Sequence, residues 1–468
     1  MNILKYTSIL AASLAAALPL GAKQQQKSNV YNDGDRACMV GDSITASGAY
    51  TLALMTYYTT RLPDTNLDFR NLGLSGDYCG GILHRMQSDI LPNFDKQRSV
   101  GVLMVGMNDA KRENFSKKTL EKLGRPALDA KIKYNRGVYE KRLGEIVNLI
   151  APNTRTLVLF TPSIYDQTAD IATENFFGVN DELVEFGKIG AKTAAKIPNV
   201  RVVDMNLKMR TVNAELQSKE GKNKTIIGSD RVHPSFPGGF VMLNAWLERF
   251  DEPREVSTVE IDAAAQKLDK SFNCDISNLS FGGGAIAFDL LAAALPFPVE
   301  KAARNLDGYM KFAQNFNREI LKISGLQNGE YALEIDGKKV GAYSAKQLAD
   351  GVNLATNTNT PQYKQAEGVY KKCVEFRTKA ANFRGIIMVE SSRRNTMDKL
   401  DVDGKIAHVK TLFDKTPQSN AFMYKTYKYY VENKKHEAER AAELPLLNAE
   451  IYKAAQPKTH AYRLVKTK

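Results

Sequence analysis

The stretch MVGDSITASG, residues 39–48, joins an apolar run to a run with helical spacing. The apolar run begins upstream as RACMVG, and AYTLALMTYYTTRL follows with apolar residues at helical intervals. A glycine, an acid and a serine lie between the two runs. Ser43 is therefore predicted at a strand-to-helix turn, where a serine either caps the helix or presents its hydroxyl as a nucleophile.

The same alternation continues to about residue 250. Further strand-like runs are LDFRNLGL, SVGVLMVG, TRTLVLFTP and VRVVDM, with helix-like runs between them and GGFVMLNAWLERF as the last. Continuous apolar runs are typical of parallel strands that are covered on both faces. The pattern predicts an α/β domain over residues 32–252, with an open parallel sheet and a ligand crevice beyond the carboxyl ends of its strands.

The pattern changes after the polar, proline-containing stretch DEPREV, residues 251–256. Short alternating segments with Asn-Gly and Asp-Gly turns, such as LQNGEYALEIDGKKV, predict a small β-rich module over residues 255–345. Residues 346–468 are rich in charge and have helical spacing. They predict a helical C-terminal region whose amphipathic helices pack on the β-rich module.

Residues 1–22 have the features of a secretory signal peptide: Lys5, an apolar run from Ser8 to Leu20, and small residues at the end. We therefore expect an exported protein, periplasmic or secreted, without an integral membrane segment. The formal net charge of +13 allows acidic partners, but cationic and acidic residues are interleaved, which favours a solvated surface. No nucleic-acid motif is present, and the oligomeric state stays open.

The chain has 4 cysteines, at positions 38, 79, 274 and 373. Export permits disulfides, and the sequence does not choose among the three possible full pairings. Cys38 is predicted about five residues before Ser43 on a strand, deep in the sheet and far from the loop before Cys79. Buried free thiols are therefore the default prediction, and no Cys/His cluster indicates a metal site.

Three other stretches add polar groups at predicted strand ends and before the last helix of the α/β domain. SDRVHPSFPGG holds Asp230 and His233, at a spacing that lets the acid orient the imidazole or lets the pair cap the next helix. VGMNDAK ends a strand with Asn108, whose amide either donates to an oxyanion or forms an Asx-turn. The glycines of NLGLSGDYCGG either turn backbone N–H groups toward a ligand or form a plain turn.

Taken together, these stretches resemble the SGNH (GDSL-type) hydrolase superfamily over residues 36–250. GDSIT resembles its first block, NLGLSGDYCGG its second, GMND its third and DRVHP its fifth, in the family order. The resemblance implies a three-layer α/β/α sandwich of the flavodoxin-like type, with no metal or organic cofactor. It also implies a nucleophile, a base and an orienting acid, namely Ser43, His233 and Asp230. The implied oxyanion donors are the backbone N–H groups of Ser43 and Gly76 and the side chain of Asn108.

The function expected from this reasoning is that of an exported serine esterase. Its expected substrate is an acylated, most simply acetylated, carbohydrate. The alternatives are a lysophospholipase or thioesterase, and a glycan-binding protein with a degenerate hydrolase domain. Tyr165 and Asp166 in TPSIYDQ follow the fourth predicted strand, where they either line the substrate pocket or form a turn after Pro162.

Overall fold

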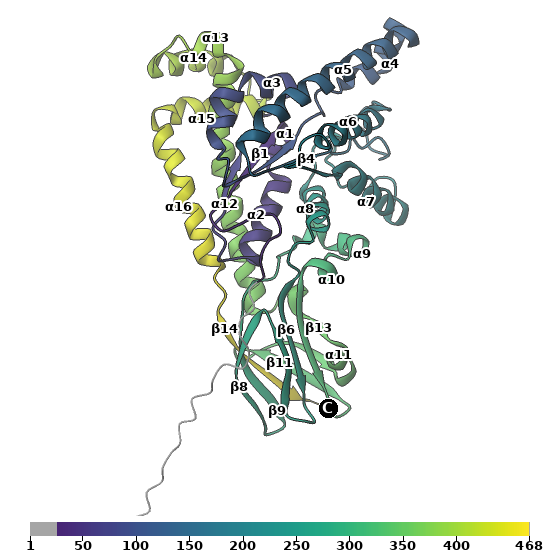
Figure 1. Ribbon diagram of the computed structural model, residues 1–468, viewed down its shortest axis with the longest axis vertical. Helices are drawn as coiled ribbons and strands as arrows, with labels where there is room; N and C mark the ends of the chain where they lie inside the picture. Colours follow the sequence, from purple (N-terminus) through teal and green to yellow (C-terminus); the bar gives the residue numbers. More distant parts are fainter. Residues whose placement is uncertain (1–25, 468) are drawn as a thin grey trace, which may run out of the picture.

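The computed structural model describes residues 26–467. The predicted signal peptide, residues 1–22, lies outside this range. Figure 1 shows an α/β domain stacked on a β-rich module along the long axis of the molecule. Within residues 26–467, no helix is long and apolar enough to span a bilayer.

The α/β domain is built on a 5-stranded parallel sheet of order β2-β1-β3-β4-β5. This is the flavodoxin-like order of doubly wound folds, as the sequence predicted. The strands run through the apolar segments identified above, and β3 is buried along its whole length. Their bounds are β1 (Arg36–Gly41), β2 (Asp68–Asn71), β3 (Ser99–Met104), β4 (Thr156–Phe160) and β5 (Val200–Val203).

Helices cover both faces of this sheet. The helices α2 and α8 pack together on one face, and α3, α5 and α6 pack in series on the other (Figure 1). The bounds are α1 (Ser43–Ser47), α2 (Ala49–Arg61), α3 (Cys79–His84), α4 (Lys117–Leu123), α5 (Arg125–Ile150), α6 (Val179–Ala194), α7 (Met205–Glu220) and α8 (Phe236–Phe250). The carboxyl ends of β1 and β3 therefore open onto one rim, which carries the loops considered below.

The β-rich module consists of two sheets, of orders β13-β10-β6-β7 and β12-β11-β14-β9-β8, with a shared apolar core. Its strands are β6 (Glu255–Asp262), β7 (Lys267–Phe272), β8 (Cys274–Gly282), β9 (Ala285–Ala292), β10 (Arg318–Ser324), β11 (Glu330–Ile335), β12 (Lys338–Ser344), β13 (Val352–Asn353) and β14 (Thr459–Lys466). Strand β14 corrects the expectation of a wholly helical C-terminal region. It pairs with β9 and β11 because its alternate residues Tyr462 and Leu464 are apolar and buried in the module.

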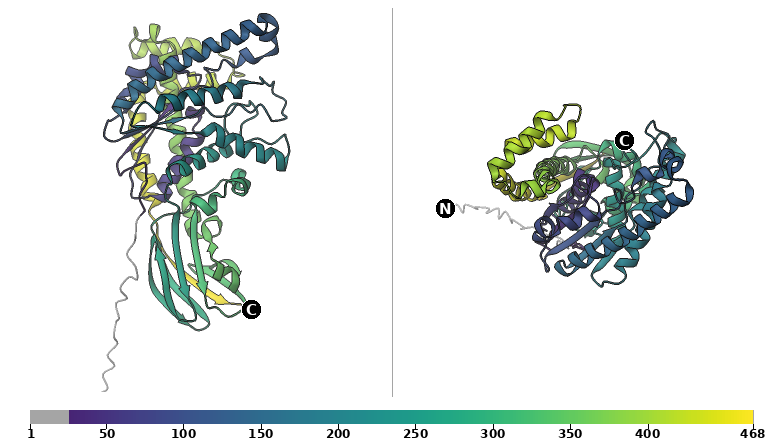
Figure 2. Two further views of the ribbon diagram at one scale, coloured as in Figure 1. Left: turned by 45° about the vertical axis from the view of Figure 1, so that its right-hand side comes forward. Right: turned by 90° about the horizontal axis from the view of Figure 1, so that it is seen from above.

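The main C-terminal helices are α12 (Pro361–Ser392), α14 (Val402–Lys415), α15 (Ala421–Asn433) and α16 (Glu437–Ala455). Of these, α12 and α16 pack on the α/β domain, and not on the β-rich module as expected, whereas α14 and α15 form a separate apolar cluster with the end of α12. Buried residues of α12 and α16 belong to the same core cluster as the parallel sheet, and Figure 2 shows these helices on one side of the domain. All 13 residues of α2 are buried, because α8 covers one side of it and α12 and α16 cover another.

The four cysteines are buried and unpaired, as predicted. Burial raises the pKa of the Cys38 thiol to about 12, and it raises the pKa of the Cys373 thiol to about 12 as well. Thiols of this kind stay protonated at neutral pH and are poor nucleophiles. They act as small apolar side chains in the core.

Candidate active site

The turn after β1 places Ser43 at the start of a helix. Asp42 is the N-cap of α1, since its side chain accepts a hydrogen bond from the Ile44 N–H at 2.9 Å. Ser43 is therefore the first helical residue and not the cap. Gly41 is required by close packing, because a Cβ there would lie 2.5 Å from the Met104 carbonyl oxygen of β3.

The structure brings Ser43, His233 and Asp230 into one hydrogen-bonded chain. Ser43 Oγ lies 2.8 Å from His233 Nε2, and His233 Nδ1 lies 2.5 Å from Asp230 Oδ2. The other carboxylate oxygen of Asp230 accepts the backbone N–H groups of Val232 and His233, both at 3.0 Å. The Asp230 side chain thus fixes both the loop and the imidazole, in the order that a serine nucleophile and its base need.

These groups are open to solvent at the rim of the sheet. The side chains of His233 and Asp230 are 42% and 50% exposed, and Ser43 is half-buried. Partial burial tends to raise the pKa of Asp230, but hydrogen bonds from His233 and neighbouring backbone N–H groups hold it below its usual value. Asp230 is therefore ionised at neutral pH and able to stabilise a charged imidazole.

Arg231 holds the loop that carries Asp230 and His233. Its backbone is left-handed, with φ of 65°, and its side chain is buried. The guanidinium donates to the backbone carbonyls of Asp166, Ala169, Ile171 and Thr173, at 2.9 to 3.0 Å. Sequence reasoning did not single out this residue, because its partners are backbone carbonyls, and no acidic residue in the sequence indicates the interaction.

The structure does not place Tyr165 and Asp166 at the substrate site. Both side chains are buried, and Tyr165 makes hydrogen bonds within its own loop, to Glu174 and Phe176. The carboxylate of Asp166 accepts hydrogen bonds from Thr168, Ala169, Asn213, Gln217 and Thr225. The prediction that they line the pocket is therefore replaced by a structural role in anchoring the loop that Arg231 also holds.

The two other predicted oxyanion donors, Gly76 and Asn108, lie together on the same rim. The Leu74 N–H donates to the Gly41 carbonyl at 3.1 Å, which sets loop 72–77 beside the turn that carries Ser43. Gly76 is exposed with φ of 80°, and its N–H makes no hydrogen bond within the described residues. Asn108 Nδ2 donates to the Asp77 carbonyl at 2.8 Å, so one N–H fixes the amide and the other is left for a ligand.

The neighbouring glycines have other roles. The Gly73 N–H donates to Asn71 Oδ1 at 3.0 Å, and a Cβ at Gly73 would lie 2.4 Å from the Ala46 nitrogen. Gly73 is therefore a packing glycine between loop 72–77 and α1. Gly80 and Gly81 lie within α3, where a Cβ would meet the side chains of Tyr78 and Asp77. Of the four glycines, Gly76 alone combines exposure with a free N–H among the described residues.

Buried acids surround this rim. Burial raises the pKa of Asp42 to about 7 and that of Asp109 to about 6, and it also raises the pKa of Asp77. Asp109 accepts the Cys79 N–H through both carboxylate oxygens, at 3.1 and 3.2 Å. Sequence reasoning overlooked these acids, although an aspartate follows the glycine or asparagine of each block, in GDS, GDY and NDA.

Comparison with known proteins agrees with this architecture. Residues 39–238 match the GDSL-like Lipase/Acylhydrolase family. A gut microbial diltiazem-metabolizing enzyme, BT4096, is 28% identical, and the alignment covers 95% of this chain and 100% of that chain with a TM-score of 0.80. No curated protein matches the sequence.

Two smaller solved structures each align with about half of this chain. Axe2, an acetylxylan esterase from Geobacillus stearothermophilus, is 18% identical over 47% of this chain and 96% of its own, with a TM-score of 0.37. LAE5, an alpha/beta hydrolase enzyme from the metagenome of Lake Arreo in Spain, is 20% identical over 48% and 98% of the two chains, also with a TM-score of 0.37.

The flavodoxin-like sheet and the family match define a carboxylic ester hydrolase of the SGNH type. Residues 39–238 form a domain of the GDSL-like lipase/acylhydrolase type, and the family match does not extend to the rest of the chain. The relative of known structure aligns over nearly the whole chain, so the β-rich module and the C-terminal helices are part of the shared architecture.

Proposed function

We propose that this protein is an exported serine esterase that removes acetyl groups from carbohydrates. The observation that carries the proposal is the hydrogen-bonded chain from Ser43 Oγ through His233 to Asp230, with separations of 2.8 and 2.5 Å. Export rests on the signal-like sequence of residues 1–22.

The proposed reaction follows from these positions. His233 Nε2 takes the proton of Ser43 as Oγ attacks the ester carbonyl, and Asp230 stabilises the imidazolium that forms. The N–H groups of Ser43 and Gly76 and the amide of Asn108 donate to the tetrahedral oxyanion. The alcohol leaves with the proton from His233, and a water molecule activated by His233 then releases the acid from Ser43.

The openness of the site supports a short acyl group on a bulky alcohol. With His233 and Asp230 about half exposed, a large alcohol can approach Ser43 from solvent. A long acyl chain would instead require an extended apolar pocket, which typically buries most of its ligand. The relative that aligns over 95% of this chain is a diltiazem-metabolizing enzyme, and its substrate is therefore a drug-sized molecule. We propose that this chain, too, accepts esters of a large alcohol.

The test is acetate or fatty-acid release from a panel of esters. The panel contains 4-nitrophenyl acetate, acetylated xylo-oligosaccharides, diltiazem, lysophosphatidylcholine and palmitoyl-CoA. We expect turnover of the acetyl esters and its loss in Ser43→Ala. Full activity of Ser43→Ala would overturn the serine mechanism. Turnover of only the long-chain substrates would replace the substrate class with that of a lysophospholipase or thioesterase.

Export has a separate test. Expression of the full chain in a Gram-negative host, followed by fractionation and N-terminal sequencing, should give a periplasmic or secreted protein that begins near residue 23. An uncleaved cytoplasmic product would overturn export and leave the esterase proposal intact.

A further inference from the structure

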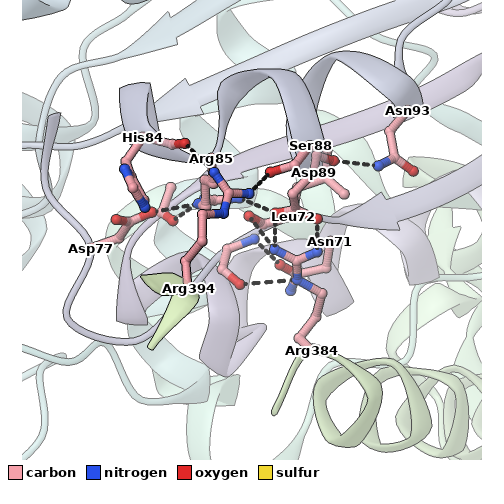
Figure 3. Close-up of polar contacts among 12 residues, drawn as sticks. Asn71, Leu72, Asp77, His84, Arg85, Ser88, Asp89, Asn93, Arg384 and Arg394 are labelled. Carbon is pink, nitrogen blue, oxygen red and sulfur yellow. Dashed lines mark hydrogen bonds and ion pairs between the residues drawn. The ribbon is translucent and has the colours of Figure 1, made fainter. Parts of the chain in front are cut away.

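A buried ion-pair network joins the C-terminal helix α12 to the α/β domain (Figure 3). Arg384 of α12 donates to both carboxylate oxygens of Asp89, at 2.6 and 2.7 Å. Asp89 also accepts from Arg85 at 2.5 Å, and Arg85 donates to Asp77 at 2.8 Å. The four side chains are only 1–10% exposed, so the network lies within the protein.

This network ends at the loop that carries Gly76. Arg384 also donates to the backbone carbonyls of Leu72 and Gly73, at 3.2 and 3.4 Å. At the other end, Asp77 presents its backbone carbonyl to Asn108 Nδ2 at 2.8 Å. Both ends of loop 72–77 are therefore held by the network, one by Arg384 directly and the other by the Arg85–Asp77 pair.

The charges of the network are balanced only when Arg384 is present. Two arginines face two aspartates, and Arg384 and Arg85 share Asp89. Burial tends to raise the pKa of Asp89, but the hydrogen bonds and charges of Arg384 and Arg85 hold it below its usual value. Without Arg384, two buried carboxylates would compete for Arg85, and a buried charge left without its partner is strongly unfavourable.

The helix α12 also contacts the segments that follow the other proposed catalytic residues. The aliphatic carbons of Arg377 occupy the space beside Gly48, at the end of the helix that Ser43 begins. The ring of Tyr370 packs edge-on against Phe236, three residues after His233, with 6.0 Å between centroids. One helix of 32 residues thus lies against all three parts of the site.

We propose that Arg384 is a positioning residue for ester hydrolysis, which fixes loop 72–77 so that the Gly76 N–H and the Asn108 amide stay aimed at the oxyanion. This inference rests on the proposed function. It assigns to the C-terminal region a role in catalysis that the region exerts through backbone geometry, without contact with the substrate. Displacement of a positioned group by about 1 Å typically costs about 100-fold in rate.

The experiment measures kcat and KM with 4-nitrophenyl acetate, together with thermal unfolding, for Arg384→Ala and Arg384→Lys. We expect kcat of Arg384→Ala to fall about 10- to 100-fold with KM changed less than about threefold, since the oxyanion contacts form in the transition state. Arg384→Lys keeps a cation beside Asp89 but cannot also reach both carbonyls, so we expect an intermediate kcat.

The matched control is Lys379→Ala, which removes a cation and an inter-helix ion pair with Glu443 from the same helix. It should leave kcat unchanged. A double-mutant cycle with Asn108→Ala tests the mechanism itself: once Asn108 is gone, Arg384→Ala can misplace only the Gly76 N–H, so it should lower kcat by a smaller factor than it does in the wild-type protein.

The proposal is overturned if folded Arg384→Ala keeps the wild-type kcat. It is also overturned if the fold-loss in kcat of the double variant equals the product of the fold-losses of Arg384→Ala and Asn108→Ala. If Arg384→Ala does not fold, Arg384→Lys decides in the same way, and a wild-type kcat in that variant overturns the proposal. The Ser43→Ala variant distinguishes failure of the serine mechanism from failure of the positioning role of Arg384. Activity in Ser43→Ala refutes the serine mechanism, whereas an inactive Ser43→Ala with fully active Arg384 variants refutes only the positioning role.

Discussion

Ser43 Oγ and His233 Nε2 lie 2.8 Å apart, although the two residues are 190 positions apart in the chain. Ser43 begins α1 just after the turn that follows β1, and His233 lies on the loop before α8, which packs on α2 beneath the same sheet. The parallel topology thus brings Ser43 and His233 together, and a single acid, Asp230, sets the orientation of the imidazole. The role of that acid can be tested without disturbing the loop.

For Asp230→Asn we expect kcat to fall about 100- to 10,000-fold with little change in KM. The asparagine Oδ1 can still accept the two backbone N–H groups that shape the loop, but its amide nitrogen would face His233 Nδ1 and favour the wrong tautomer. Steady-state kinetics with 4-nitrophenyl acetate gives the result, and thermal unfolding controls for folding. A kcat within threefold of wild type would show that Asp230 does not orient the base.

The two glycines of loop 72–77 should respond differently to alanine. Gly76 has open space where a Cβ would sit but a φ of 80°, so Gly76→Ala should cost about 1 kcal/mol of stability. Because relief of this strain turns the N–H away from the oxyanion, we expect kcat to fall about 10- to 100-fold.

Gly73→Ala is the matched comparison, since its Cβ would lie 2.4 Å from the Ala46 nitrogen. Overpacking of this kind typically costs about 1 to 3 kcal/mol. Urea denaturation and kcat of both variants make the comparison. If Gly73→Ala lost more kcat per folded molecule than Gly76→Ala, the oxyanion donor would have to be reassigned within the loop.

Much of this site could be anticipated from local pattern. Ser43, Asn108 and His233 each stand where a strand or loop meets the same rim, and the alternation of strand and helix placed them there. The β14 strand was missed, because its partners β9 and β11 are distant in the chain and the stretch before it, from Pro361 to Ala455, is almost wholly helical.

The contribution of Arg384 could not be predicted in the same way. It contacts the Gly73 carbonyl across 311 positions, and that contact depends on how α12 packs on the sheet. For Tyr165 and Asp166 the sequence suggested a role in the site that the structure does not give them. Both follow a strand, as site residues often do, but their side chains are buried and hydrogen-bonded within the protein, and the sequence does not indicate these contacts.

Asp166 offers a direct test of its structural role. All the groups that contact its carboxylate are donors, so Asp166→Asn sets an NH₂ group against N–H and O–H groups in a buried site. We expect a loss of about 2 to 4 kcal/mol in the free energy of unfolding. Because the side chain does not line the substrate site, the KM of the folded variant should be unchanged. A large increase in KM with normal stability would restore the pocket assignment.

The last prediction concerns Glu319, a buried acid in β10, at the junction of the β-rich module with α12. Its Oε1 accepts a hydrogen bond from Gln362 at 2.5 Å, and its Oε2 has no partner among the described residues. Burial raises the pKa of Glu319 from 4.5 to about 7. The folded protein therefore holds a proton between about pH 4.5 and 7 that the unfolded chain has released. The wild-type free energy of unfolding falls over that range by about 3 kcal/mol on account of this group.

Glu319→Gln removes the titration and keeps the shape of the side chain. Relative to wild type, the variant should have nearly the same stability at pH 4.5 and gain about 3 kcal/mol by pH 8, because it carries no buried charge. Urea denaturation at both pH values measures this difference, and subtraction of the wild-type values cancels the buried acids Asp42 and Glu252, whose pKa values burial also raises to about 7. The exposed Glu330→Gln is the control for loss of one acid. Equal wild-type and Glu319→Gln stabilities at pH 8 would mean that Glu319 is ionised and paired in the folded protein.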